Sequence, residues 1–246
     1  MTTRRWQRPS WFALVLTVAG VISFARLGLW QLERAEEARG LEATFAAAAA
    51  APERTLESLG ERLAAQSWPR VRVRGHFVAD RGYLRDEQVR HGTLGIEAYA
   101  VFALDPGQAA DPASVVLVDR GWIAATVAAR ATQPLPALPT GDVALAGIYA
   151  PFPGSGLRMG GNALPAQATW PKLTLAIEHA EIAADLGQPL LPRVLLLDAD
   201  AASGFARGWT PTAMPPERHL GYAVQWFAFA LAAVAIFVLL HFRRPR

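Results

Sequence analysis

Apolar residues gather at the two ends of this 246-residue chain, and a longer mixed segment lies between them. The first apolar run extends from Trp11 to Trp30, with Arg26 as its one charged residue. At about 1.5 Å of rise per residue, a helix over this run is roughly 30 Å long, which matches the hydrocarbon core of a bilayer. Arg26 is near enough to the end of the run for its side chain to reach the interface. The pattern predicts a transmembrane helix over residues 11–30.

A second apolar run extends from Gly221 to Phe242 and predicts a transmembrane helix over residues 219–242. Basic residues cluster outside both runs, at Arg4, Arg5, Arg8, Arg243, Arg244 and Arg246. Because basic flanks stay on the cytoplasmic side, we expect cytoplasmic tails at residues 1–10 and 243–246. The segment 31–218 is then a domain on the outer side of the membrane.

A cleavable signal peptide is the alternative interpretation of the first run. Ser23-Phe24-Ala25 has the small-x-small pattern of a cleavage site. However, the apolar run continues beyond that site to Trp30, and Trp11 and Trp30 bracket it as interfacial anchors do. These features favour a retained helix.

The segment between the two runs carries the pattern of a β-rich domain. From Arg70 to Phe77, apolar Val71, Val73 and Phe77 alternate with basic residues, as in a strand with one buried face. Further predicted strands cover residues 82–89, 95–104, 115–123, 143–152 and 190–197. Helices are predicted over residues 52–66 and 176–186, the second ended by Gly187. The expected fold is a mostly antiparallel β (α+β) domain between two transmembrane α-helices.

Composition removes several classes of function. The chain has no cysteine, which excludes disulfides, iron–sulfur sites and copper chaperones of the paired-cysteine type. The net charge of +3 is small, and six of the 24 basic residues lie in the two tails, so we expect no nucleic-acid partner. The sequence contains no G-x-S-x-G or P-loop motif, and its five histidines form no pair with metal-ligand spacing. An enzyme is therefore disfavoured. The Gly- and Pro-rich segment 153–171 is expected to be a loop without an assigned role.

One group of side chains remains as a candidate site, at the start of the second apolar run. Its members recur at steps of three and four, on one face of a helix: His219, Tyr222, Trp226 and Phe229. Neutral imidazole is a ligand for haem iron, and aromatic side chains can pack on a porphyrin. The alternative is an ordinary interfacial belt of aromatic side chains.

Four blocks of the sequence resemble those of one family. Residues 27–34 (LGLWQLER) are similar to L-G-x-W-Q-L-x-R, and residues 70–77 to a V-x-V-x-G-x-F strand. Residues 116–123 (VLVDRGWI) resemble V-L-V-N-R-G-W-V, and residues 218–227 (RHLGYAVQWF) resemble R-H-L-x-Y-A-x-Q-W-F. The blocks occur in this order in SURF1-type proteins. Asp119 stands where asparagine is usual, and Ala124 replaces a frequent proline.

The resemblance implies an assembly factor for haem–copper cytochrome c oxidase, and not an enzyme. It implies a multi-pass protein of the bacterial inner membrane with a periplasmic domain. The implied ligand is haem a, bound transiently, and the implied partners are the lipid bilayer, oxidase subunit I and haem a synthase. The second-helix histidine linked to haem a in bacterial members corresponds to His219, the expected metal ligand, and Trp226 matches a tryptophan near that site.

Around His219 we expect Tyr222 and Trp226 to pack on the haem. Trp30 and Arg34 lie one helical turn apart at the same membrane face, and Arg34 can pair with a haem propionate. Anchoring of the helix end is the alternative role for these two. Arg120 is expected to form a structural salt bridge, and the face of Arg70, Arg72 and Arg74 to be solvated.

Two other functions are retained as alternatives. A scaffold would stabilise a subunit I intermediate without binding haem. A membrane-anchored enzyme would act on haem or quinone.

Overall fold

The computed structural model describes residues 5–6, 8–59, 63–64, 67–108, 115–154, 163–212 and 214–243. The chain divides into two compact units, Met1–Phe45 with Thr210–Arg246, and Ala46–Trp209. Of the basic tails, Arg4, Arg244 and Arg246 lie outside the described residues.

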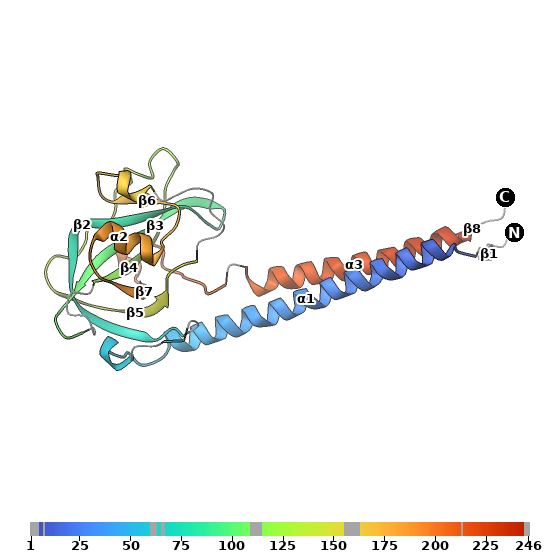
Figure 1. The fold of residues 1–246 in the computed structure, drawn as a ribbon, viewed down its shortest axis with the longest axis horizontal. Coiled ribbons are helices and arrows are strands. Elements are labelled where there is room, and N and C mark those ends of the chain that lie inside the picture. Colours follow the sequence, from blue (N-terminus) through green and yellow to red (C-terminus); the bar gives the residue numbers. More distant parts are fainter. Residues whose placement is uncertain are drawn as a thin grey trace. The chain divides into compact units, whose positions relative to one another are not determined.

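The second unit is built on a mixed six-stranded sheet (Figure 1). Its strands are β2 (Arg70–Arg90), β3 (Thr93–Leu104), β4 (Val115–Ala124), β5 (Val143–Pro151), β6 (Lys172–Thr174) and β7 (Leu190–Leu197). The start of β2 pairs with β5 and the rest of it with β3, so the ring β2-β3-β4-β7-β5 closes on itself. Within this ring only β4 and β7 are parallel. The prediction of a mostly antiparallel β domain between two long apolar helices is confirmed.

The core of this closed sheet receives side chains from all five strands of the ring. They are Val71, Val73, Phe102, Val116, Val118, Tyr149 and Leu195. The alternation predicted for residues 70–77 is confirmed at its centre, because Val71 and Val73 are buried while Arg72 and Arg74 are exposed. A second cluster contains Leu84, Ile96 and Phe205.

The strands predicted over residues 70–77 and 82–89 are one continuous strand, so their separation is wrong. The pairing of β2 with β3 is instead irregular between Phe77 and Gly82 and again between Arg85 and Gln88. Asp80 and Glu87 adopt positive φ angles of 54° and 58° at these two places. Residues that signal a turn here form bulges, which bend a strand without ending it.

The helix predicted over residues 52–66 is wrong for the residues that the structure describes. A short 3-10 helix covers Leu56–Leu59, and Arg54 bridges to Val71 of the sheet. Leu56, Leu59 and Leu63 pack against the core, so the apolar spacing marks a buried contact but not an α-helix. Residues 60–62 and 65–66 lie outside the described part.

Helix α2 (His179–Leu186) lies within the predicted range 176–186 and ends at Gly187, as predicted. Gly187 has a φ of 64°, the left-handed conformation that favours glycine. The segment 153–171 carries a short 3-10 helix at Leu164–Ala166, while its residues 155–162 are outside the described part. Sequence reasoning missed the edge strand β6, because three residues carry too little periodicity.

An ion pair attaches β6 to α2. Lys172 Nζ lies 2.5 Å from Asp185 Oδ1, and the two side chains are 9% and 4% exposed. The Tyr83 hydroxyl donates to the other oxygen of Asp185 at 2.9 Å.

We expect Asp185→Ala to lower the free energy of unfolding by about 3–5 kcal/mol, since it leaves the Lys172 ammonium buried and unpaired. Urea unfolding of the full chain in detergent measures this effect. The double variant Lys172→Met/Asp185→Ala should recover part of the loss. A double variant less stable than Asp185→Ala alone would contradict the explanation.

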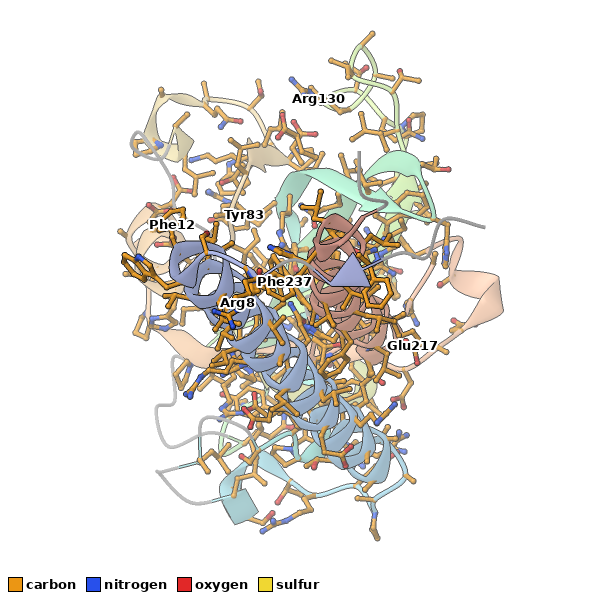
Figure 2. The ribbon with its side chains drawn as sticks, turned by 90° about the vertical axis from the view of Figure 1, so that its right-hand side faces the viewer. Arg8, Phe12, Tyr83, Arg130, Glu217 and Phe237 are labelled. Atoms are coloured by element: carbon orange, nitrogen blue, oxygen red, sulfur yellow. The ribbon has the colours of Figure 1, made fainter. Side chains whose placement is uncertain are left out.

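The first unit holds two long apolar helices, α1 (Trp11–Ala49) and α3 (Pro216–His241), each long and apolar enough to cross a membrane. Most of their large apolar side chains are exposed, including Phe12, Leu16 and Leu231, so these are not the buried core helices of a soluble domain. Figure 2 labels Phe12 near the start of α1 and Phe237 near the end of α3. Strands β1 (Arg5–Trp6) and β8 (Phe242–Arg243) pair beyond these two helix ends.

Candidate functional site

The two long helices pack as an antiparallel pair, shown side by side in Figure 1. The buried residues of α1 are Gly28, Gln31, Ala35 and Ala38, at steps of three and four. On α3, Ala223 is buried at the same seam of small residues. Spacing of this kind keeps one face of a helix against its partner. Three of the four buried positions on α1 are small residues, which are common where helices pack in membranes.

The contact between His219 and Gln31 is the main polar feature of this seam. His219 Nδ1 lies 2.8 Å from Gln31 Oε1, and Gln31 is 8% exposed. A buried amide is costly unless it is hydrogen-bonded, so the pair fixes the register of α3 against α1. If Nδ1 carries the proton that the Gln31 oxygen accepts, a neutral ring has its lone pair on Nε2, the atom that can bind a metal.

Trp226 lies further along the same seam, two helical turns from His219. Its ring stacks on Phe24 at 5.9 Å between centroids and contacts Phe229 edge-on at 5.8 Å. A step of seven residues corresponds to about 10 Å along a helix. The structure therefore brings Trp226 to Phe24 on α1 and does not bring it beside the imidazole.

Close packing next to this cluster depends on Gly28. A Cβ atom built at Gly28 lies 2.7 Å from Phe227 Cε1, so no larger residue fits without movement of that ring. The L-G-x-W-Q-L block on α1 and the Q-W-F block on α3 thus meet each other in the folded chain.

Trp30, Arg34 and Tyr222 lie on the outer surfaces of the helix pair. Trp30 is 46% exposed and Tyr222 is 41% exposed. The Arg34 guanidinium carbon is 6.0 Å from the centre of the Trp30 ring, and Nη1 forms an ion pair with Glu37 at 2.8 Å. An exposed pair of this kind contributes little stability. Arg34 can therefore exchange Glu37 for another carboxylate at small cost.

The arrangement fits a haem with one protein ligand. The donor would be the Nε2 atom of His219, with the ring oriented through Nδ1 by Gln31 in the way that outer hydrogen bonds orient metal-bound histidines. Trp30 and Tyr222 supply exposed aromatic surface for a porphyrin, and Arg34 supplies a cation for a propionate. Within the part of the chain that the structure describes, no group of three or more acidic, histidine or cysteine side chains could hold a bare metal ion.

Gln31 and Phe24 are the members of this site that sequence reasoning missed. Gln31 is a strongly polar residue directly after an apolar run and one residue from Trp30, and that isolation is the signal that marks it. Phe24 carries no signal of its own, because one more phenylalanine in a transmembrane run is ordinary.

The closed sheet of the second unit, called the barrel below, carries the arginines that were named from the sequence. Their contacts in the fold are with other parts of the same domain. Arg120 is buried, but its Nη2 donates to the carbonyl oxygens of Pro136 and Ala137, at 2.6 and 3.2 Å. Among the described residues it forms no ion pair, so the expected salt bridge is wrong. Arg70 pairs with Asp198, and Arg72 pairs with Glu53 at 2.6 Å.

Asp119 is a buried acid within the barrel. Its Oδ1 accepts a hydrogen bond from the Gly121 amide at 2.8 Å. Burial, reinforced by the negative charge of Glu97, raises the pKa of Asp119 to about 8. Glu97 forms ion pairs with Arg85 at 3.0 Å and with Arg90 at 2.9 Å.

Fold and site together define a protein whose two candidate membrane helices flank a closed β-sheet domain and carry one oriented histidine. The SURF1 family model matches residues 18–231 of the chain. This protein belongs to the SURF1 family, which is associated with cytochrome oxidase assembly and known for assembly factors rather than enzymes.

Similar proteins cover nearly the whole chain. An uncharacterised SURF1-like protein of Mycobacterium bovis is 27% identical over 232 residues, which cover 92% of this chain and 81% of the relative. A SURF1-like protein of Mycobacterium tuberculosis matches to the same extent. A SURF1-like protein of Monosiga brevicollis is 26% identical over 229 residues, covering 89% of this chain and 84% of the relative.

Proposed function

We propose that this protein assists the assembly of haem–copper cytochrome c oxidase by holding haem a on its way to the catalytic subunit. His219 is the iron ligand in this proposal. The observation that carries it is the contact of 2.8 Å between His219 Nδ1 and Gln31 Oε1 in the helix seam of a SURF1-family chain. Within the described part of the chain, the hydrogen bond of this ring is made by Nδ1, so Nε2 is the nitrogen that would bind the iron.

The other predicted residues have separate parts in the proposal. Trp30 and Tyr222 offer apolar contact to the porphyrin at the surface of the helix pair, and Arg34 binds a propionate after releasing Glu37. Trp226 acts from a distance, because its stacking on Phe24 holds α3 in the register that places His219 against Gln31.

The proposed setting is the inner membrane of a bacterial cell. Residues 11–30 and 219–242 span the bilayer, the basic tails 1–10 and 243–246 are cytoplasmic, and the domain 31–218 is periplasmic. Subunit I of the oxidase is the proposed receiver of haem a, and haem a synthase is the proposed donor.

The visible spectrum of the full chain tests this function. The protein is purified from cells that synthesise haem a, together with His219→Ala, Gln31→Leu and His241→Ala. We expect wild type to carry haem a, and His219→Ala to lose most of it. Gln31→Leu should weaken haem affinity by about 10–100-fold, as loss of an orienting partner does.

His241→Ala is the matched control. His241 lies at the other end of α3, and its ring nitrogen contacts the Phe237 carbonyl oxygen at 2.7 Å. Its replacement should leave haem content unchanged. Equal haem content in wild type and His219→Ala would overturn the ligand assignment. If wild type carried no haem while His219→Ala still supported oxidase assembly, the scaffold function would replace this proposal.

A further inference from the structure

A cavity of about 390 Å³ lies on the barrel domain, and none of the residues proposed for haem line it. Strand β5 forms one wall through Ala144, Leu145 and Ala146, and segment 197–207 forms another. Phe77, Leu145 and Phe205 supply apolar surface. The volume is in the range of small-molecule sites.

Two arginines at this cavity donate hydrogen bonds only to backbone oxygens, among the residues that the structure describes. Arg120 donates to the carbonyl oxygens of Pro136 and Ala137. Arg207 donates through Nε to the Arg120 carbonyl oxygen at 2.9 Å and through Nη1 to the Asp198 carbonyl oxygen at 2.8 Å. Neither guanidinium forms an ion pair within that part of the chain.

The acidic side chains at the cavity do not neutralise both charges. Both carboxylate oxygens of Asp198 accept from Arg70. Asp200 is exposed, and its Oδ1 caps a 3-10 helix by accepting from the Ala202 amide at 2.9 Å. Asp198 is thus balanced by Arg70, which leaves Asp200 as the one other acid among the described residues that line this cavity.

Of the two guanidinium groups, the one whose charge is unfavourably buried is that of Arg120, which is 8% exposed. Its guanidinium carbon is 4.7 Å from the centre of the Phe205 ring. Burial, together with the charge of Arg207, lowers the pKa of Arg120 to about 10. A buried charge without a counter-ion is unfavourable, so an anion that enters the cavity gains a charge-assisted contact that the free protein lacks.

We propose that this cavity binds an apolar small molecule with one anionic headgroup, a carboxylate or a phosphate. The headgroup lies at Arg120 and Arg207, and the apolar body lies against Phe77, Leu145 and Phe205. A polar sugar lacks the apolar body that this site would hold, and a neutral lipid lacks the anionic headgroup. The site uses neither His219 nor Gln31, so it is independent of the proposed haem function.

Octanoate is the probe that tests the site, and octan-1-ol is its neutral counterpart of the same length. Binding is measured by ligand-observed NMR on the full chain in phosphatidylcholine nanodiscs, after subtraction of the signal from empty nanodiscs. We expect octanoate to bind about tenfold or more tightly than octan-1-ol, as a charge-assisted contact provides. Octyl phosphate is measured in parallel, and the tighter of the two anions identifies the headgroup.

Two variants locate the binding. Arg207→Gln should weaken octanoate about tenfold or more and remove the preference over octan-1-ol. Ala146→Leu fills the cavity but keeps both arginines, and should weaken octanoate and octan-1-ol alike. Arg81→Gln is the charge-matched control, because Arg81 lies over the Trp170 ring outside the cavity lining.

Equal binding of octanoate and octan-1-ol to wild type would overturn the proposal. Full octanoate affinity in Ala146→Leu would overturn it too, even if Arg207→Gln failed to fold. None of these measurements requires haem, so failure here leaves the test of His219 unaffected.

Discussion

Replacing Gly121 by alanine is expected to destabilise the barrel domain by about 3 kcal/mol or more, although the change adds only one methyl group. Gly121 has a φ of 116°, in a region that residues with a side chain rarely adopt. An added Cβ would also lie 2.9 Å from both Phe205 Cβ and Arg207 Cγ. The neighbouring chain cannot move away easily, because Ala206 and Trp122 exchange two backbone hydrogen bonds of 2.8 and 2.9 Å.

Gly141→Ala separates the two causes of this loss. Gly141 also has a positive φ, 75°, but an added Cβ meets nothing within 4 Å. Its replacement should cost about 1 kcal/mol, the backbone term alone. Urea unfolding of both variants in the full chain measures the difference. Equal losses would show that crowding at Phe205 and Arg207 contributes nothing.

Replacing Asp119 by asparagine is expected to remove a pH dependence from the stability of the barrel. Asparagine keeps an oxygen that can accept from the Gly121 amide, but it carries no charge. It is also the residue usual at this position of the family's V-L-V-N-R-G-W-V block. We therefore expect the variant to be more stable than wild type at pH 8, by a few kcal/mol on the order set by the Asp119 pKa shift.

The direction of this pH dependence follows from proton binding by Asp119 in the folded and the unfolded chain. The pKa of Asp119 rises from 3.8 to about 8 on folding, because burial disfavours the carboxylate. Between these values the folded chain holds a proton that the unfolded chain has released. The stabilising contribution of this proton is present below pH 3.8 and is lost as the pH rises toward 8, by at most about 1.4 kcal/mol per pH unit.

Urea midpoints of the full chain at pH 5 and pH 8 measure the effect. Wild type should lose stability over this interval relative to Asp119→Asn. Asp142→Asn removes a charge from a side chain that is 83% exposed and should follow wild type. Parallel curves for wild type and Asp119→Asn would show that Asp119 is ionised in the folded protein at both pH values.

The local sequence pattern was sufficient to predict the structure of a segment where a single physical rule governs that segment. Two apolar runs flanked by basic residues predict two long helices, because the bilayer fixes both length and hydrophobicity. Alternation fixes the buried face of residues 70–77, since successive side chains of a strand point to opposite faces. Gly187 ends α2 because glycine takes the left-handed conformation at low cost. The proposed role of His219 has a different origin, the resemblance of residues 218–227 to the R-H-L-x-Y-A-x-Q-W-F block, and stays a prediction.

Other features of the fold and of the candidate sites depend on contacts between segments that are distant in the sequence. Asp80 to Gly82 has the composition of a turn, yet hydrogen bonds to β3 on either side of it keep β2 one strand. Strand β6 exists because Lys172–Thr174 lies beside Tyr83–Arg85, which no local pattern records. Gln31 belongs to the candidate site because its side chain contacts the imidazole of His219, which lies 188 residues away in the sequence. The charges of Arg120 and Arg207 meet at one cavity because β4 and the segment after β7 are neighbours in the folded barrel. Such contacts depend on which segments pack against each other in the folded chain. That packing is determined by the total burial of the core and overrides the local propensity of any single segment.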